Sequence, residues 1–207
     1  MIQKIKDRIV GLIARIWNAV LEAGWRRKLK NDGFSIICSS CIGGVIYNRL
    51  GKQFLSPTIN MFFSQRDFIR FAVNLKHYLS QELVFIESDK PYPVAMLDDI
   101  TLYFNHSSSP EEAANDWNRR KTRIRYDKLY LIFYYREGYS LDEIREIEKA
   151  PCVRKIMLTS TPVDLPYAYC IRENKGRVNS ESFLDKDQFG IRTFEKQWDF
   201  VSWLNGE

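Results

Sequence analysis

The sequence has few of the residues that build disulfide frameworks and metal centres. Its 207 residues include four cysteines, and its only histidines are His77 and His106. Four cysteines in a chain of this length do not form a disulfide scaffold, and two histidines without a second cysteine pair argue against a zinc site. Cys38 and Cys41 form a C-x-x-C pattern, but Cys38 continues an apolar strand. We therefore expect Cys38 to be buried and not to act as a redox cysteine.

Long apolar runs are also absent from the sequence. No run reaches the roughly 18–20 residues needed to cross a bilayer. Asp7, Arg8 and Arg15 interrupt the apolar positions near the N-terminus, which argues against a signal peptide. We therefore expect a reduced, cytoplasmic protein, with a peripheral position on the inner face of the membrane as a further hypothesis.

The body of the chain has no excess of basic residues. Residues 1–30 contain eight basic and two acidic residues and carry a net charge of +6. Since the whole chain carries +5, the other 177 residues together carry −1. A nucleic-acid-binding domain needs a basic patch on its folded surface, so we expect no nucleic-acid partner.

The N-terminal segment itself is typical of a basic amphipathic helix. Apolar residues recur at spacings of three and four over residues 2–23, which places them on one face, with Arg8 and Arg15 on another. Trp17 and Trp25 flank this apolar stripe. Such a helix favours contact with an anionic membrane surface. The alternatives are docking onto the rest of the chain or onto a second copy.

The remaining residues are typical of a globular α/β protein, because 45% of the chain is apolar and 14% is aromatic. We predict strands at 34–37, 59–63, 83–86, 94–97, 101–104, 129–135, 153–158 and 167–171, and helices that begin near residues 43, 64, 109, 140 and 194. Strands that alternate with helices predict one layered α/β domain over residues 32–207 with a largely parallel or mixed sheet. The N-terminal helix and a turn, residues 1–31, precede it.

The stretch from Phe34 to Leu50 is the first of these strand-to-helix units. A short apolar strand turns through Ser39, Ser40 and Cys41 into a helix that opens with two glycines. The start of a helix presents free backbone N–H groups and a partial positive charge. We therefore expect a ligand or a reaction at this turn.

Several blocks of the sequence resemble one bacterial family. They are FSIICSSCIGGVIYNRLG, SPTINMFF, RDFIRFAVNLKHYL, YPVAMLDDITLYFNH, AANDWNRRKTRIRYDKL and WDFVSWLN. In this order they resemble the Domain of Unknown Function 1919 family, often labelled an exopolysaccharide biosynthesis protein, over roughly residues 32–205. The resemblance implies a role in surface polysaccharide biosynthesis beside glycosyltransferases, and it implies no particular reaction. The family's two asparagines and aromatic residue in the first block are replaced here by Ser39, Ser40 and Ile42.

Cys41 and His106 are the first candidates for chemistry. A thiol at a helix start has a stabilised thiolate, and His106, in a polar loop after a predicted strand, is a candidate base. The alternative is that Cys41 fills space beside the glycines. Asp98 and Asp99 also follow a predicted strand, where they would do acid–base work or hold a divalent metal beside a sugar diphosphate. The alternative, which we favour, is a simple turn at the end of the strand.

Two groups of residues are candidates for substrate binding. Ser39, Ser40, Gly43 and Gly44 would bind phosphate through backbone and hydroxyl groups, or the glycines would serve close helix–sheet packing. The pattern matches neither a Walker loop nor a dinucleotide fingerprint. The second group would form an aromatic and cationic patch, or else a solvated helix face: Trp117, Arg119, Arg120 and Arg123.

These observations lead to two functional hypotheses. The first is a transferase that uses a phosphorylated or nucleotide-linked sugar in exopolysaccharide biosynthesis, with no cofactor indicated. The second is a non-catalytic adaptor that docks glycosyltransferases at the membrane through residues 2–23. A shared cleft for Cys41, His106 and Asp99 would favour the first hypothesis, because proton transfer requires hydrogen-bond reach.

Overall fold

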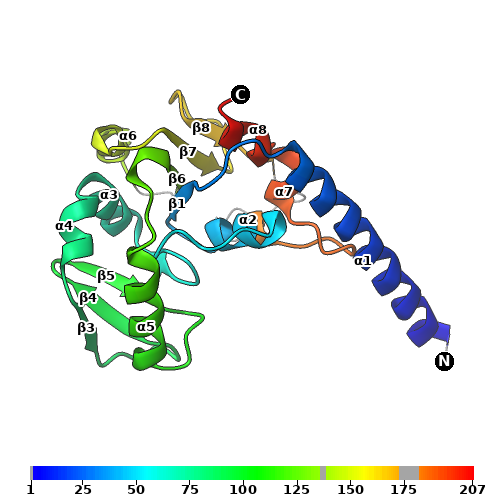
Figure 1. Cartoon of the computed structure of the whole chain (residues 1–207), viewed down its shortest axis with the longest axis horizontal. Coiled ribbons are helices and arrows are strands. Elements are labelled where there is room, and N and C mark those ends of the chain that lie inside the picture. The colour runs from blue at the N-terminus through cyan, green and yellow to red at the C-terminus, as the bar shows by residue number, and fades with distance from the viewer. Residues whose placement is uncertain (1, 136–138, 173–181) are drawn as a thin grey trace.

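The computed structural model describes residues 2–135, 139–172 and 182–207, except for the side chains of residues 2–7 and 182. A long N-terminal helix, α1 (Ile2–Lys28), extends away from a body of mixed α/β structure (Figure 1). The protein therefore has the α/β fold with an N-terminal helix that the sequence predicts. The helix is longer than predicted, since it continues to Lys28.

The body contains a parallel sheet with strand order β1-β6-β7-β8. Its strands are β1 (Ser35–Cys38), β6 (Leu129–Tyr134), β7 (Arg154–Thr159) and β8 (Ala168–Cys170). Every residue of β1, at the edge of the sheet, and of β6, inside it, is buried, as expected for parallel strands covered on both faces. Alternate residues of β6 serve opposite cores. Leu129, Leu131 and Phe133 belong to one apolar cluster, and Tyr130, Ile132 and Tyr134 belong to the other.

A second, antiparallel sheet has the order β2-β5-β4-β3. It contains β2 (Phe62–Phe63), β3 (Leu83–Ile86), β4 (Val94–Leu97) and β5 (Ile100–Tyr103). All four strands lie between β1 and β6 in the sequence, so this sheet is an insertion in the connection between two neighbouring parallel strands. The largely parallel or mixed sheet that we predict is thus divided into a parallel and an antiparallel sheet.

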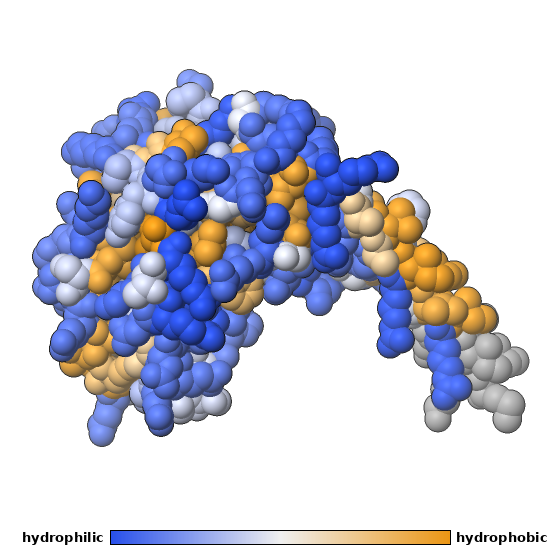
Figure 2. Space-filling model, in the orientation of Figure 1, coloured by the Kyte–Doolittle hydropathy of each residue, from blue (hydrophilic) through white to orange (hydrophobic). Residues whose placement is uncertain are grey.

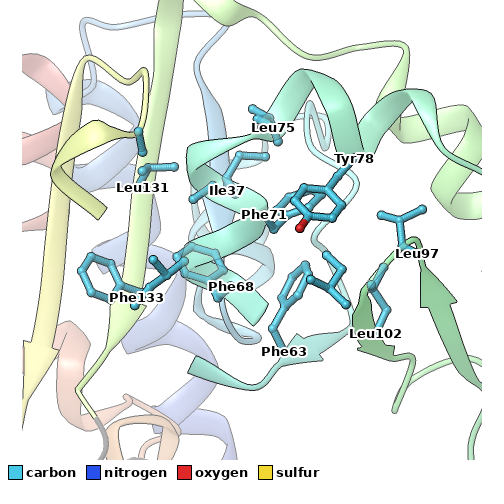
Figure 3. Close-up of a cluster of buried hydrophobic side chains, with 14 of the residues drawn as sticks. Ile37, Phe63, Phe68, Phe71, Leu75, Tyr78, Leu97, Leu102, Leu131 and Phe133 are labelled. Carbon is cyan, nitrogen blue, oxygen red and sulfur yellow. The ribbon is translucent and has the colours of Figure 1, made fainter. Parts of the chain in front are cut away.

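One apolar core lies between the two sheets. It includes residues from β1, β6, the antiparallel sheet and helix α3 (Gln65–Val73). In Figure 3, Phe63, Phe68 and Phe71 lie at the centre, between Leu131 and Phe133 of the parallel sheet and Leu97 and Leu102 of the antiparallel sheet. Four further elements contribute side chains to this core: α4 (Leu75–Ser80), α5 (Pro110–Lys121), α6 (Leu141–Arg145) and the 3-10 turn Glu146–Lys149 that follows α6. Aromatic packing across this core fixes one sheet against the other.

The second core covers the opposite face of the parallel sheet. It receives α2 (Ile42–Leu50), α7 (Thr193–Gln197) and α8 (Phe200–Asn205), together with Phe183 of the short turn Ser182–Leu184. The single closing helix predicted near residue 194 is two short helices. The chain is extended at Trp198, and the side chain of Asp199 accepts a hydrogen bond from the Ser202 N–H to start α8.

Three predicted helix starts are confirmed by their hydrogen bonds. The hydroxyls of Ser64, Ser109 and Ser140 accept from the backbone N–H three residues later, at the starts of α3, α5 and α6. Glu143 also returns a bond to the Ser140 N–H and completes a capping box. The helix predicted from residue 64 is interrupted at Asn74, which separates α3 from α4.

Helix α1 contacts the body through its C-terminal half. It packs against α2 and α8. The ring of Trp25 contacts the ring of Phe200 in a tilted orientation, with the centroids 5.1 Å apart. Among the helices in the described part of the chain, none has the length and apolarity to cross a membrane.

Candidate functional site

A cavity of about 500 Å³ lies at the carboxyl ends of β1 and β6. Open α/β sheets bind ligands outside the carboxyl ends of their strands, so this position agrees with the fold. The turn after β1, the end of β6, the end of the antiparallel sheet and residues 184–192 all contribute to its wall. The lining residues are Ser40, Cys41, Gly44, Val45, Asn48, Asn60, Phe62, Asn105, His106, Tyr134, Leu184, Lys186 and Arg192.

Cys41 and His106 meet in this cavity. Cys41 precedes the first residue of α2, and His106 lies just beyond the end of β5. The Cys41 Sγ lies 3.2 Å from the His106 Nε2, within hydrogen-bond distance for sulfur. The two residues are 65 positions apart in the chain, so the insertion that carries the antiparallel sheet brings the imidazole to the thiol.

The environment of Cys41 favours the protonated thiol when no substrate is bound. Burial raises the pKa of the Cys41 thiol above its ordinary value. A hydrogen bond from Asn105 and the positive charge of Arg192 act in the opposite direction and are smaller effects. The expectation that the helix start lowers this pKa is therefore wrong, and reaction at the sulfur requires a base such as His106.

Two cations line the same cavity as the thiol, and neither stands out in the sequence. Lys186 and Arg192 pair in a short antiparallel bridge. The carboxylate of Asp187 stabilises the turn between them by accepting from the Phe189 and Ile191 N–H groups at 2.9 and 3.0 Å. The turn thus places two positive charges on one side of the cavity.

The turn residues proposed to bind phosphate divide into two groups. Ser40 and Gly44 line the cavity, whereas Ser39 and Gly43 do not. A Cβ atom at Gly43 would lie 3.0 Å from the Cβ of Cys38, so this glycine allows α2 to pack closely on β1. Its structural role is the helix–sheet packing that the sequence left open as an alternative.

Cys38 has no access to this cavity. Its side chain is completely buried, and burial raises the pKa of its thiol to about 11. The expectation that Cys38 is buried is therefore met.

Asp98 and Asp99 form the two-residue turn between β4 and β5 and do not line the cavity. Asp98 has a positive φ of 56°, typical of hairpin turns, and its carboxylate lies 2.7 Å from the His77 Nε2. Asp99 accepts from the Tyr78 hydroxyl at 2.7 Å. The turn lies at one end of β5 and His106 lies beyond the other end. At about 3.4 Å per residue of strand, the turn and His106 are separated by a distance on the order of 15 Å. The aspartates and the Cys41–His106 pair therefore do not form one site.

The predicted aromatic and cationic patch, on α5 and just after it, also lies away from the cavity. Trp117 is buried in the core, with ring contacts to Phe71 and Phe104. Arg120 is buried too and donates to the Ile59 carbonyl at 3.1 Å. Arg119 pairs with Asp116. Arg123, like these three residues, is not part of the cavity lining.

No group of three or more histidine, cysteine, aspartate or glutamate side chains among the described residues is placed to hold a metal ion. The groups that the cavity does bring together include a thiol, an imidazole, three amides and two cations. Their arrangement suits an anionic substrate and a proton transfer between sulfur and imidazole.

Comparison with known proteins identifies relatives without a stated activity. The model of the family described as "Domain of unknown function (DUF1919)" matches residues 13–205. An uncharacterized protein of Haemophilus influenzae, strain Rd, is 30% identical over 204 residues, which are 98% of this chain and 97% of that protein. The family match begins within α1, earlier than the predicted start at residue 32. It includes every residue that lines the cavity.

Proposed function

The chain belongs to the family described as a domain of unknown function (DUF1919), and we propose that it is a transferase of bacterial exopolysaccharide biosynthesis. Its substrate in this proposal is a phosphorylated or nucleotide-linked sugar. One observation carries the proposal: Cys41 and His106, 3.2 Å apart, share a cavity with Lys186 and Arg192.

The phosphate of the donor binds on the cationic side of the cavity. Arg192 offers a planar set of N–H donors and Lys186 a point charge, and both suit phosphate oxygens. The first turn of α2, which begins beside Cys41, adds the partial positive charge of a helix start. A volume of about 500 Å³ is within the usual range for a ligand of this size.

Cys41 and His106 then carry the transfer. The Cys41 S–H bond breaks and its proton passes to His106 Nε2 as the sulfur bonds to the sugar carbon. The bond between that carbon and the phosphate oxygen breaks, and the phosphate leaves with its charge balanced by Arg192 and Lys186. In the second half of the reaction the hydroxyl oxygen of an acceptor sugar bonds to the sugar carbon as the carbon–sulfur bond breaks. The hydroxyl proton is lost to solvent, and His106 returns to the sulfur the proton that it accepted in the first half.

A ligand-stabilisation screen of the purified protein against sugar phosphates and nucleotide sugars tests this proposal. A true ligand at about 100 times its Kd stabilises the folded state by about 2.7 kcal/mol, which raises the melting temperature. Arg192→Gln should abolish the shift. Arg119→Gln, which removes an arginine outside the cavity, should retain it. A flat response of the unaltered protein across the screen would overturn the proposal.

The adaptor hypothesis remains the second candidate, because α1 exposes apolar residues that the body does not cover. Genetic complementation separates the two functions. The measurement is polysaccharide production in a strain that lacks the gene and receives each variant. Cys41→Ala and His106→Ala should fail to restore production if the protein is the transferase. Full restoration by both variants would favour the adaptor.

A further inference from the structure

Helix α1 carries an exposed apolar face. Seven large apolar side chains between residues 9 and 20 are 38–60% exposed: Ile9, Val10, Leu12, Ile13, Ile16, Trp17 and Val20. In Figure 2 the hydrophobic atoms of this helix lie on its outer side and the hydrophilic ones on the side toward the body. An apolar patch of this kind on a folded protein indicates an interaction surface.

The helix uses its polar side to dock onto the body, so the apolar face is not required for folding. Asn18 donates to the Phe189 carbonyl at 2.6 Å, and Arg26 donates to the Arg49 carbonyl at 3.1 Å. Glu22 lies 3.0 Å from the Arg49 guanidinium. At 100° per residue, Asn18 and Glu22 point roughly opposite to Ile9, which lies in the apolar stripe. The usual orientation of a surface helix, apolar side inward, is reversed.

The width and charge of this face fit a flat anionic surface better than a second helix. On a helical wheel drawn at 100° per residue, Leu12 lies at one edge of the apolar arc and Val10 at the other, and the arc covers about 160° of the circumference. This is wider than the narrow seam of a coiled coil. Arg8 and Arg15, both exposed, occupy equivalent heptad positions beside the arc. Among the side chains of α1 that the structure describes, the one acidic group is Glu22, which pairs with Arg26 and Arg49 on the docked side and does not pair with either arginine. Lipid phosphates would complement both.

We infer that α1 binds the surface of an anionic lipid bilayer, lying in the interface with its apolar face toward the acyl chains. Trp17, at the edge of the arc, suits the headgroup level. Arg8 and Arg15 contribute electrostatic attraction. The body then remains on the aqueous side, held to α1 through Asn18, Glu22 and Trp25.

Sedimentation of the full-length protein with lipid vesicles tests this inference. The protein should sediment with vesicles that contain phosphatidylglycerol, less so as salt is raised, and poorly with phosphatidylcholine alone. Leu12→Glu/Ile16→Glu should lower the partition coefficient at least about tenfold. Val84→Glu/Val153→Glu is the matched control, because these residues are as exposed but lie on the body; it should bind normally. All four sites are exposed, so thermal unfolding should be unchanged.

Two results would overturn the inference. One is that the unaltered protein stays in the supernatant with anionic vesicles. The other is equal sedimentation of the Leu12→Glu/Ile16→Glu variant. Light scattering after size-exclusion chromatography tests for the competing occupant, a second copy of the chain. If the unaltered protein is a dimer that does not bind vesicles, and the Leu12→Glu/Ile16→Glu variant is a monomer, the apolar face is a dimer interface.

Discussion

The Arg49 Nε of α2 donates to Glu195 of α7 at 2.6 Å, with side chains that are 11% and 0% exposed. The same guanidinium lies 3.0 Å from Glu22 of α1. Glu195 in turn lies 3.6 Å from the guanidinium of Arg192. One buried carboxylate therefore joins the helix that follows Cys41 to the segment that carries the cavity cation.

Replacing Glu195 by glutamine should lower the free energy of unfolding by about 3 kcal/mol. The change leaves Arg49 partly desolvated without its closest charge partner, and breaking one side of a buried pair costs about 3–5 kcal/mol in other proteins. Urea denaturation measures the difference. Glu146→Gln is the control, since its pair with Lys149 is exposed on both sides and should contribute no more than about 1 kcal/mol. Equal losses in the two variants would contradict the structural role of Glu195.

Gly43→Ala should destabilise the protein by about 1–3 kcal/mol, because overpacking of a close contact forces its neighbours to move. The added Cβ would meet Cys38 Cβ at 3.0 Å and Ile36 Cγ2 at 3.3 Å. Gly24→Ala, in α1, meets nothing within 4 Å and should instead stabilise by about 0.5–1 kcal/mol through helix propensity. Thermal unfolding of both variants gives the sign of each effect. A neutral Gly43→Ala would show that α2 can move away from β1.

The stability of the protein should fall as pH rises from about 9 to about 11, partly through Cys38. Burial raises the pKa of this thiol from 9.0 in the unfolded chain to about 11 in the folded protein. Between these values the unfolded state has lost a proton that the folded state retains, so the free energy of unfolding drops by about 1.4 kcal/mol per pH unit. Cys38→Ala should show a shallower slope by that amount in urea denaturation at several pH values. An identical slope would mean that Cys38 does not titrate as described.

The features that follow from neighbouring residues were predictable from the sequence. Ser109 followed by Pro110, and Ser140 followed three residues later by Glu143, mark helix starts through bonds formed within one turn. The all-apolar run of β6 likewise predicts a strand covered on both faces. In each case the deciding interactions lie within a few residues, where the sequence is directly informative.

The composition of the cavity depends on contacts between distant residues, and there sequence reasoning was less successful. Cys41 and His106 were paired from chemistry alone and do lie together. Arg192 and Lys186 were missed, because nothing local distinguishes a cation near a cavity from one in solvent. Trp117 was chosen for its neighbours on α5, but its own helix face is buried against Phe71 and Phe104. Placing such residues requires the packing of one element on another.

His106 should accelerate alkylation of Cys41, and this provides a test of the pair that needs no substrate. The raised pKa of Cys41 keeps the thiol protonated near neutral pH, and only the thiolate reacts with iodoacetamide. An imidazole 3.2 Å from the sulfur can accept the proton as the bond forms. His106→Gln should therefore slow the reaction of Cys41 at least about tenfold. Peptide mass spectrometry follows Cys41 separately from Cys152 and Cys170.

His77→Gln is the matched control for this experiment, because it removes the other histidine of the chain. His77 pairs with Asp98 in the hairpin turn and does not line the cavity, so its loss should leave the rate at Cys41 unchanged. The rate in the unaltered protein should also rise with pH until the thiol itself ionises, after which the imidazole gives no further advantage. Equal rates for His106→Gln and the unaltered protein at neutral pH would show that the 3.2 Å contact transfers no proton, and the nucleophile assignment would fail with it.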